Sequence, residues 1–145
     1  MPLRILLVED LAECAAMTAV VLREYGHEVQ TARDGPSALA ACRQQLPDVV
    51  LLDIGLPGIS GYEVAKQLRD EFDMATPMLI AITGYGRRDD RKQSAAAGID
   101  LHLVKPFDWV ELNSILDSLE PSKGDTLNGS TLQSNLNTRR VRLPR

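Results

Sequence analysis

Residues 49–53 read Val-Val-Leu-Leu-Asp, an apolar run that ends directly on a carboxylate. Four consecutive apolar residues between Pro47 and the turn at Leu56–Gly58 are typical of a short strand that is buried on both faces. Such strands occur in parallel sheets that helices cover on both sides, whereas half-exposed strands alternate apolar and polar residues. The stretch therefore predicts a central strand of an α/β protein, with Asp53 at its carboxyl end.

Three further apolar runs lead in the same way into residues that carry a charge or a hydroxyl. They are Ile5–Val8 before Glu9 and Asp10, Leu79–Ile82 before Thr83, and Leu101–Val104 before Lys105 and Pro106. In a parallel sheet the carboxyl ends of the strands lie along one edge, where ligands bind. We therefore expect three carboxylates, a hydroxyl and an ammonium to converge at one edge of the sheet.

Segments with helical patterning alternate with these runs. A second short strand is expected at His27–Ala32, and helices are expected at 11–25, 34–45, 60–72, 88–97 and 108–119. Ser60 with Glu63, and Asp108 with Glu111, have the capping-box spacing that marks the start of a helix. Five strands and five helices in strict alternation predict a doubly wound sandwich of three layers.

The composition is that of a soluble globular protein, with 44% hydrophobic and 25% charged residues among 145. No apolar run is long enough to span a bilayer and the amino terminus lacks a signal-peptide pattern, so we expect a cytoplasmic protein without a membrane partner. Cys14 and Cys42 are too few and too widely spaced for a disulfide framework or a zinc site, and we expect both thiols to be buried. Met17 is expected beside Cys14 on the apolar face of the first helix.

The composition changes after residue 120, where Ser, Thr, Asn, Gly and Arg dominate. The last 25 residues contain one acidic residue, Asp125, and these basic residues: Lys123, Arg139, Arg140, Arg142 and Arg145. Their net charge is +4, so the chain's total of −4 leaves −8 for residues 1–120. We expect one domain at 1–120 and a polar, disordered tail at 121–145, with ordering by a partner as the alternative. An acidic domain argues against direct DNA binding.

Asp53 is the natural nucleophile of the expected cluster, because a carboxylate can attack phosphorus to give an aspartyl phosphate. Glu9 and Asp10 would repel an anionic phosphoryl group, and a divalent cation would remove that conflict. Mg²⁺ prefers oxygen ligands, so we expect Asp10 and Asp53 to bind it directly and Glu9 through water. A backbone carbonyl after Asp53, such as that of Gly55, would complete the protein ligands.

Lys105 supplies the remaining positive charge. Its ammonium is expected to pair with Asp53 at rest and with a phosphoryl oxygen after transfer. The Thr83 hydroxyl and the Gly84 amide are expected to bind further phosphoryl oxygens. Pro106 fixes the backbone beside the lysine, and the Lys105-Pro106 bond is a candidate cis peptide.

Residues 3–120 resemble the receiver domain of two-component response regulators. The matching motifs are Glu9-Asp10, the stretch Asp53–Gly61, Thr83-Gly84 and Lys105-Pro106-Phe107. The resemblance implies a flavodoxin-like (βα)5 fold and magnesium-dependent transfer of phosphate from a phosphohistidine to Asp53, followed by slow self-catalysed loss of that phosphate. The domain would then be a regulatory module rather than an enzyme. Residues 81–86 also resemble receivers that are fused to hybrid histidine kinases.

The resemblance also implies partners. The phosphoryl donor would be a sensor histidine kinase or a histidine phosphotransfer protein. Phosphorylation would change the face formed by the fourth helix, fifth strand and fifth helix, which would bind a downstream protein or form a phosphorylation-dependent dimer. The chain would act alone, pass phosphate onward in a relay, or be a receiver excised from a larger protein.

His102 departs from the family pattern, because the position three before the lysine commonly holds Tyr or Phe. Its ring could act as that aromatic ring does, moving inward on phosphorylation, or stay outside as a solvated strand residue. Gly55 and Tyr85 occupy positions that flank the path of the attacking water in the family and would set the phosphate lifetime. His27 is interpreted as a solvated turn residue, and Trp109 as a packing residue with partner contact as the alternative.

Two other functions use related chemistry or the same fold. An aspartate-nucleophile phosphohydrolase also forms an aspartyl phosphate, but it needs a second Asp two residues after the nucleophile, where this chain has Gly55. A flavin-binding electron carrier would need a hydroxyl- and Gly-rich phosphate loop after the first strand, where this chain has Glu9-Asp10-Leu11. The receiver interpretation is therefore preferred.

Overall fold

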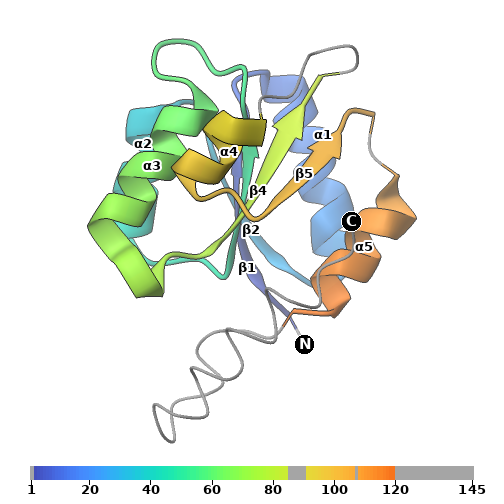
Figure 1. Ribbon diagram of the computed structural model, residues 1–145. Coiled ribbons are helices and arrows are strands. Elements are labelled where there is room, and N and C mark those ends of the chain that lie inside the picture. The colour runs from blue at the N-terminus through green and yellow to red at the C-terminus, as the bar shows by residue number, and fades with distance from the viewer. Residues whose placement is uncertain (1, 85–90, 107, 120–145) are drawn as a thin grey trace, which may run out of the picture.

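The computed structural model describes residues 2–84, 91–106 and 108–119 (Figure 1). Predictions for Tyr85, Phe107 and the tail at 121–145 lie outside these residues. The described residues form a five-stranded parallel sheet in the order β2-β1-β3-β4-β5. The strands are β1 (Arg4–Val8), β2 (Glu28–Ala32), β3 (Val49–Asp53), β4 (Met78–Thr83) and β5 (Leu101–Val104).

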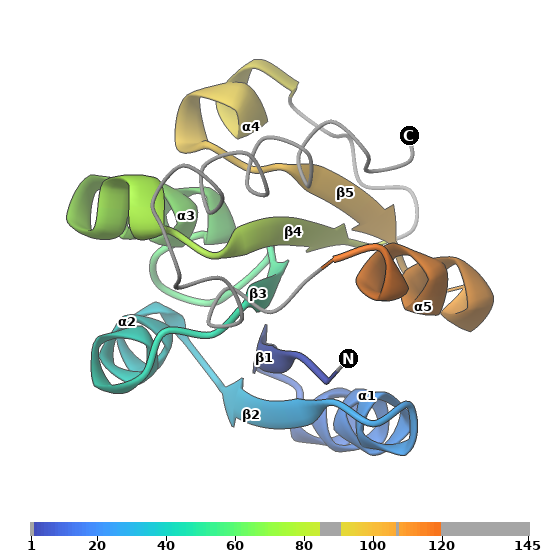
Figure 2. The ribbon, with the colours of Figure 1, turned by 90° about the horizontal axis from the view of Figure 1, so that it is seen from below.

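Helices cover both faces of the sheet, as Figure 2 shows. They are α1 (Ala12–Glu24), α2 (Gly35–Gln44), α3 (Gly61–Phe72), α4 (Arg91–Ala97) and α5 (Trp109–Asp117), with a short 3-10 turn, η1 (Asp73–Ala75), after α3. α1 and α5 pack on one face, and α2, α3 and α4 pack on the other. This is the flavodoxin-like doubly wound order, which confirms the predicted fold class.

Two hydrophobic clusters, one on each face of the sheet, make up the core. Alternate residues of a strand point to opposite faces. Leu51 therefore belongs to the cluster beneath α1 and α5, and its neighbour Leu52 to the cluster beneath α2 and α3, with both side chains fully buried. Full burial of one such side chain contributes about 1.5–3 kcal/mol.

Three helices start at capping residues, of which the sequence predicted two, Ser60 and Asp108. Asp34 accepts a hydrogen bond from the backbone N–H of Ser37 at 2.9 Å, and Ser60 accepts one from Glu63 at 3.3 Å. Asp108 accepts from the N–H groups of both Val110 and Glu111, at 3.0 and 3.2 Å. These contacts satisfy donors that have no partner within the first turn of a helix.

The predicted buried face of α1 is partly wrong. Met17 is 65% exposed and Cys14 is only half-buried, whereas Ala15, Ala19 and Leu22 are buried. The small side chains of Ala15 and Ala19 let the helix lie close to the sheet, and Met17 then faces outward. Hydrophobicity alone favours the larger residue for the core, so the pattern gave the wrong face here. Cys42 is buried, as predicted.

The interpretation of His27 as a solvated residue is also wrong, because the side chain is only 6% exposed. Its Nδ1 accepts a hydrogen bond from the backbone N–H of Leu3 at 3.1 Å. That bond needs an unprotonated Nδ1, and burial lowers the pKa of the imidazole despite an opposing effect of Asp117. His27 is therefore a structural residue that ties the start of β1 to the start of β2.

Candidate functional site

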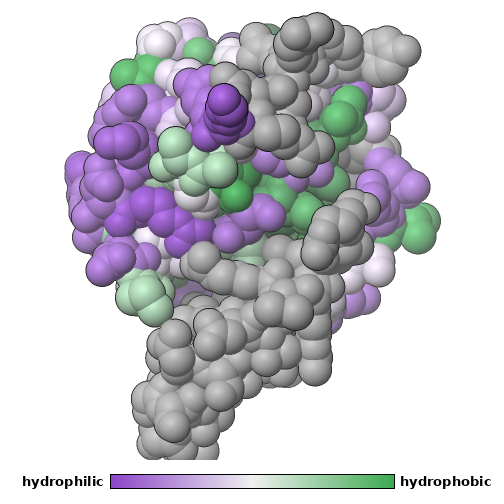
Figure 3. All heavy atoms as spheres, viewed as in Figure 1, coloured by the Kyte–Doolittle hydropathy of each residue, from purple (hydrophilic) through white to green (hydrophobic). Residues whose placement is uncertain are grey.

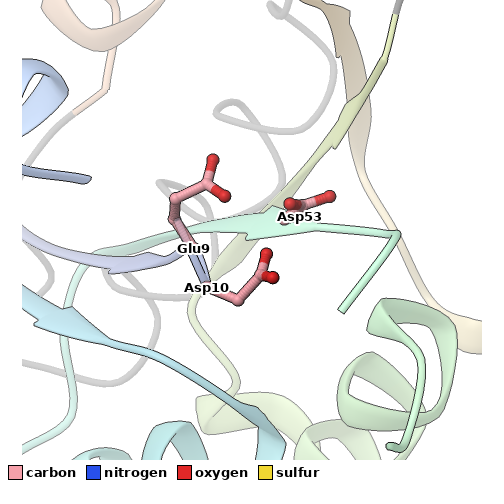
Figure 4. Close-up of side chains that lie close together, drawn as sticks. All are labelled: Glu9, Asp10 and Asp53. Carbon is pink, nitrogen blue, oxygen red and sulfur yellow. The ribbon is translucent and has the colours of Figure 1, made fainter. Parts of the chain in front are cut away.

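Three carboxylates meet at the carboxyl edge of the sheet. Glu9 and Asp10 follow β1, and Asp53 ends the adjacent strand β3. Each offers one oxygen, and the three oxygens lie within 4.8 Å of one another. Figure 4 shows the three side chains gathered over the strand ends. The predicted convergence of the acidic residues is thus present in the structure.

Asp53 is half-buried and its Oδ1 accepts a hydrogen bond from the backbone N–H of Gly55 at 2.9 Å. Burial raises the pKa of this carboxyl, and the negative charge of Glu9 raises it further. The Gly55 hydrogen bond and the Lys105 ammonium lower it, but the pKa remains above its usual value. In the absence of a further cation, ionised Asp53 is therefore disfavoured by its surroundings.

Lys105 lies after β5 and reaches across the strand ends to Glu9, where its Nζ donates a hydrogen bond to Oε1. Burial lowers the pKa of Lys105, but the hydrogen bond and charge of Glu9, together with the charge of Asp53, raise it overall. Within the described residues Lys105 donates no hydrogen bond to Asp53, which was its expected resting partner. Glu9 is 3% exposed, so it needs a counter-charge more than the half-buried Asp53 does.

Thr83 ends β4 beside this pair. Its side chain is buried, and its hydroxyl donates a long hydrogen bond of 3.4 Å to the carbonyl oxygen of Leu103 on β5. The backbone N–H of Lys105 donates to the Thr83 carbonyl at 2.9 Å, which fixes the two residues side by side. Gly84 follows at an exposed position, and the Lys105-Pro106 peptide bond is cis.

Gly61 has a role that the sequence reasoning did not identify. A Cβ at this position would lie 2.6 Å from the carbonyl oxygen of Asp53 and 2.7 Å from the Cα of Ile54, closer than side chains can approach. Its N–H donates to the Ile54 carbonyl at 3.1 Å. Only glycine therefore lets α3 begin directly against the end of β3. Glycine is unfavourable within a helix, so its presence at the first position of α3 was a signal in the sequence for a close backbone contact.

His102 is not a solvated strand residue, because its ring is half-buried and contacts α4. Its Nε2 lies 2.7 Å from the hydroxyl oxygen of Ser94, whose side chain is buried. The contact joins β5 to the neighbouring helix. Ser94 was not singled out in the sequence, because nothing local marks a serine in a short polar helix as a histidine partner.

The acidic cluster fits a magnesium ion. Mg²⁺ binds six oxygens at about 2.0–2.1 Å, so oxygens of its shell lie about 3–4 Å apart. Oxygens of Glu9, Asp10 and Asp53 within 4.8 Å of one another are compatible with that shell after small side-chain movements. An open hollow lined by Asp10, Arg33, Asp34, Ser37 and Pro57 borders the cluster. The cluster is therefore accessible from the surface.

The described residues thus form a doubly wound sheet with three carboxylates and a lysine at its carboxyl edge. The Response regulator receiver domain matches residues 5–117, and the chain belongs to this family. It is thus a receiver domain of two-component signalling, a generally regulatory module whose family interacts with histidine kinases. None of the described helices has the length and apolar character needed to cross a membrane.

Similar proteins include the Response regulator PleD of Caulobacter vibrioides, which is 39% identical over 120 residues, or 82% of this chain and 26% of PleD. Among solved structures, the response regulator TrrA of Thermotoga maritima in complex with Mg(2+)-BeF is 34% identical, with a TM-score of 0.71, and the match covers 81% of this chain and 97% of TrrA. The receiver domain of sensor histidine kinase PA1611 from Pseudomonas aeruginosa, with a magnesium ion coordinated in its active site cleft, is 32% identical, with a TM-score of 0.72 and coverage of 81% and 96%. The chain spans between a quarter and about half the length of curated relatives that it matches.

Proposed function

We propose that Asp53 accepts a phosphoryl group from a phosphohistidine, with Mg²⁺ as cofactor, and that this changes the binding properties of the domain. The observation that carries the proposal is the grouping of Asp53 with Glu9, Asp10 and Lys105 at one edge of the sheet. Two similar receivers were solved with magnesium, one of them together with BeF, and this supports the same cofactor here.

In the proposed transfer, an oxygen of Asp53 forms a bond to phosphorus while the bond from phosphorus to the donor imidazole nitrogen breaks. The donor is a sensor histidine kinase or a histidine phosphotransfer protein. Asp10 and Asp53 would hold magnesium directly, Glu9 through water, and the Gly55 carbonyl would complete the protein ligands. Magnesium, when bound, supplies positive charge beside the transferring oxygens.

The remaining site residues bind the phosphoryl group after transfer. The Lys105 ammonium neutralises one oxygen, and the Thr83 hydroxyl and the Gly84 amide donate to others. The present bond from Thr83 to Leu103 is long, at 3.4 Å, so a phosphoryl oxygen would compete with it effectively. Movement of the Thr83 hydroxyl would then break its hydrogen bond to Leu103 on the adjacent strand β5.

The proposed output surface is the face formed by α4, β5 and α5. Val104 on β5 and Val110 on α5 are 54% and 77% exposed. Figure 3 shows apolar surface on this side of the molecule, whereas the surface over α3 is hydrophilic. Exposed apolar side chains of this size are suited to a protein partner, either a downstream protein or a second copy of the domain. We assign this function to residues 1–120.

Incubation with acetyl phosphate and Mg²⁺ tests the proposal, with intact mass spectrometry as the readout. We expect a single phosphoryl adduct on the native chain and none on Asp53→Asn or in the presence of a chelator. Asp70→Asn is a matched control, because Asp70 is an exposed residue of α3 that pairs with Lys66. It should form the adduct normally. An adduct that survives Asp53→Asn or chelation would contradict the proposal.

A further inference from the structure

Glu9 is the most buried carboxylate of the acidic cluster, and both of its oxygens accept a hydrogen bond. Oε1 accepts the hydrogen bond from Lys105, and Oε2 accepts one from the backbone N–H of Leu11 at 3.2 Å. Asp10 and Asp53 differ, because within the described residues no lysine or arginine donates a hydrogen bond to either of them. A positive charge therefore occupies the cluster at one defined carboxylate.

A cation that enters the cluster meets this pair directly. A magnesium shell draws on carboxylate oxygens, either by direct contact or through bound water, and each Glu9 oxygen already accepts one hydrogen bond while Lys105 holds it. The ammonium and the metal also repel each other, by about 1 kcal/mol at 4 Å in water and by more in a half-buried site. Both effects act in the same direction.

We propose that Lys105 is the resting counter-ion of the cluster and that it competes with magnesium for Glu9. The inference rests on the proposed function only in taking magnesium as the cation. Before phosphoryl transfer Lys105 then pairs with Glu9 rather than with Asp53. Binding of Mg²⁺ frees the ammonium, which then lies beside Asp53. The order has a chemical advantage, because Lys105 becomes available to a phosphoryl oxygen only once the site carries its cation.

The competition predicts that the effect of Lys105 on magnesium affinity depends on the charge at Asp53. In the free domain two cations share three carboxylates, and the lysine weakens binding of the metal. When Asp53 carries an anionic phosphoryl analogue, the added negative charge can engage both cations at once. Removal of the lysine charge should therefore strengthen magnesium binding in the free domain and weaken it in the presence of beryllofluoride.

Calorimetric titration with Mg²⁺ alone tests the competition in the free domain on four full-length chains: the native chain, Lys105→Met, Glu9→Gln and the double variant. We expect Lys105→Met to bind Mg²⁺ roughly three- to tenfold more tightly than the native chain. In the Glu9→Gln background the same change should strengthen Mg²⁺ binding clearly less than in the native chain, because the contested carboxylate is gone and only the repulsion between ammonium and metal remains. Lys66→Met, which removes an exposed lysine of α3, is the control for net charge and should leave affinity unchanged.

A second readout follows the lysine itself. The Cε and Nζ resonances of Lys105 should shift during the Mg²⁺ titration with the midpoint that calorimetry gives, and should already lie near the shifted position in Glu9→Gln. Unchanged affinity in Lys105→Met, or equal strengthening with and without Glu9, would overturn the inference while leaving the proposed function intact. No binding of Mg²⁺ to the native chain would contradict the proposed function and the inference together.

Discussion

At the scale of single residues, the site brings three carboxylates together with the ammonium of Lys105, so negative charge is in excess. Asp53 is half-buried beside Glu9, and the Lys105 ammonium donates its hydrogen bond to Glu9 while its charge also lowers the pKa of Asp53. Burial and the charge of Glu9 keep the pKa of Asp53 raised, so this carboxyl takes up a proton more readily in the folded than in the unfolded chain. The proposed reaction needs Asp53 in its ionised form, which these surroundings destabilise. A bound cation would offset that destabilisation.

Asp53→Asn is expected to stabilise the metal-free domain at pH 7 by about 1 kcal/mol, because it removes a half-buried negative charge beside Glu9. The Asn oxygen can still accept the Gly55 hydrogen bond. Since the folded-state pKa of Asp53 is raised, the unfavourable effect exists at pH values above it. The gain should shrink as the pH falls through the raised pKa towards the unfolded value near 4.

Urea denaturation of both chains in chelator, at pH 7 and at pH 4, measures this difference in the free energy of unfolding. Asp70→Asn should change the free energy much less, because Asp70 is exposed and its contact with Lys66 is 3.8 Å long. An Asn variant less stable than the native chain at pH 7 would mean that Asp53 is stabilised by its neighbours, against the direction of its pKa shift.

At the scale of elements, the local signals for caps and strands predicted the structure correctly, whereas the burial of several side chains between elements was predicted wrongly. The helix caps at Asp34, Ser60 and Asp108 depend on residues two or three positions away, so the sequence contains the whole interaction. The strands were equally visible, because burial on both faces leaves unbroken apolar runs. The exposure of Met17 and the burial of His27 depend on how elements pack, which spacing alone does not determine.

Side-chain contacts hold α4, the shortest helix described, against its neighbours. Ser94 contacts His102 of β5, and Arg69 of α3 donates to the Gly98 carbonyl at 2.7 Å just after the helix. The same guanidinium lies 3.0 Å from Asp100. Because α4 belongs to the proposed output face, we expect these contacts to resist a rearrangement of that face.

Ser94→Ala is expected to loosen α4, because it removes the hydroxyl that His102 contacts and leaves a half-buried ring nitrogen without that partner. We expect a loss of about 1–3 kcal/mol in local stability, seen as faster amide exchange across α4 and β5 by mass spectrometry. Ser114→Ala, at an exposed position on α5, should leave exchange of α4 unchanged. Unaltered exchange in Ser94→Ala would show that the contact does not hold the helix.

At the scale of the whole molecule, both hydrophobic clusters are built from residues between Leu3 and Leu119. The sheet, its helices and the acidic site are complete within that span, which agrees with the family match at 5–117. Composition predicts that the domain ends at residue 120, because the apolar periodicity stops where the basic segment begins, and this boundary stays a prediction. The pairing of Lys105 with Glu9, residues 96 positions apart, could not be predicted in this way.

A chain truncated after residue 120 should therefore keep the free energy of unfolding of the full chain within about 0.5 kcal/mol, because both clusters, as the described residues form them, lie between Leu3 and Leu119. Its magnesium affinity should also be retained, although removal of a segment with net charge +4 strengthens cation binding slightly at low salt. Truncation after residue 108 is the matched contrast, since it deletes the buried residues Leu112, Ile115 and Leu116 of α5 and should leave the chain unfolded. Urea denaturation of the three chains measures their free energies of unfolding. A large loss of stability on removing 121–145 alone would show that the basic segment is part of the folded domain.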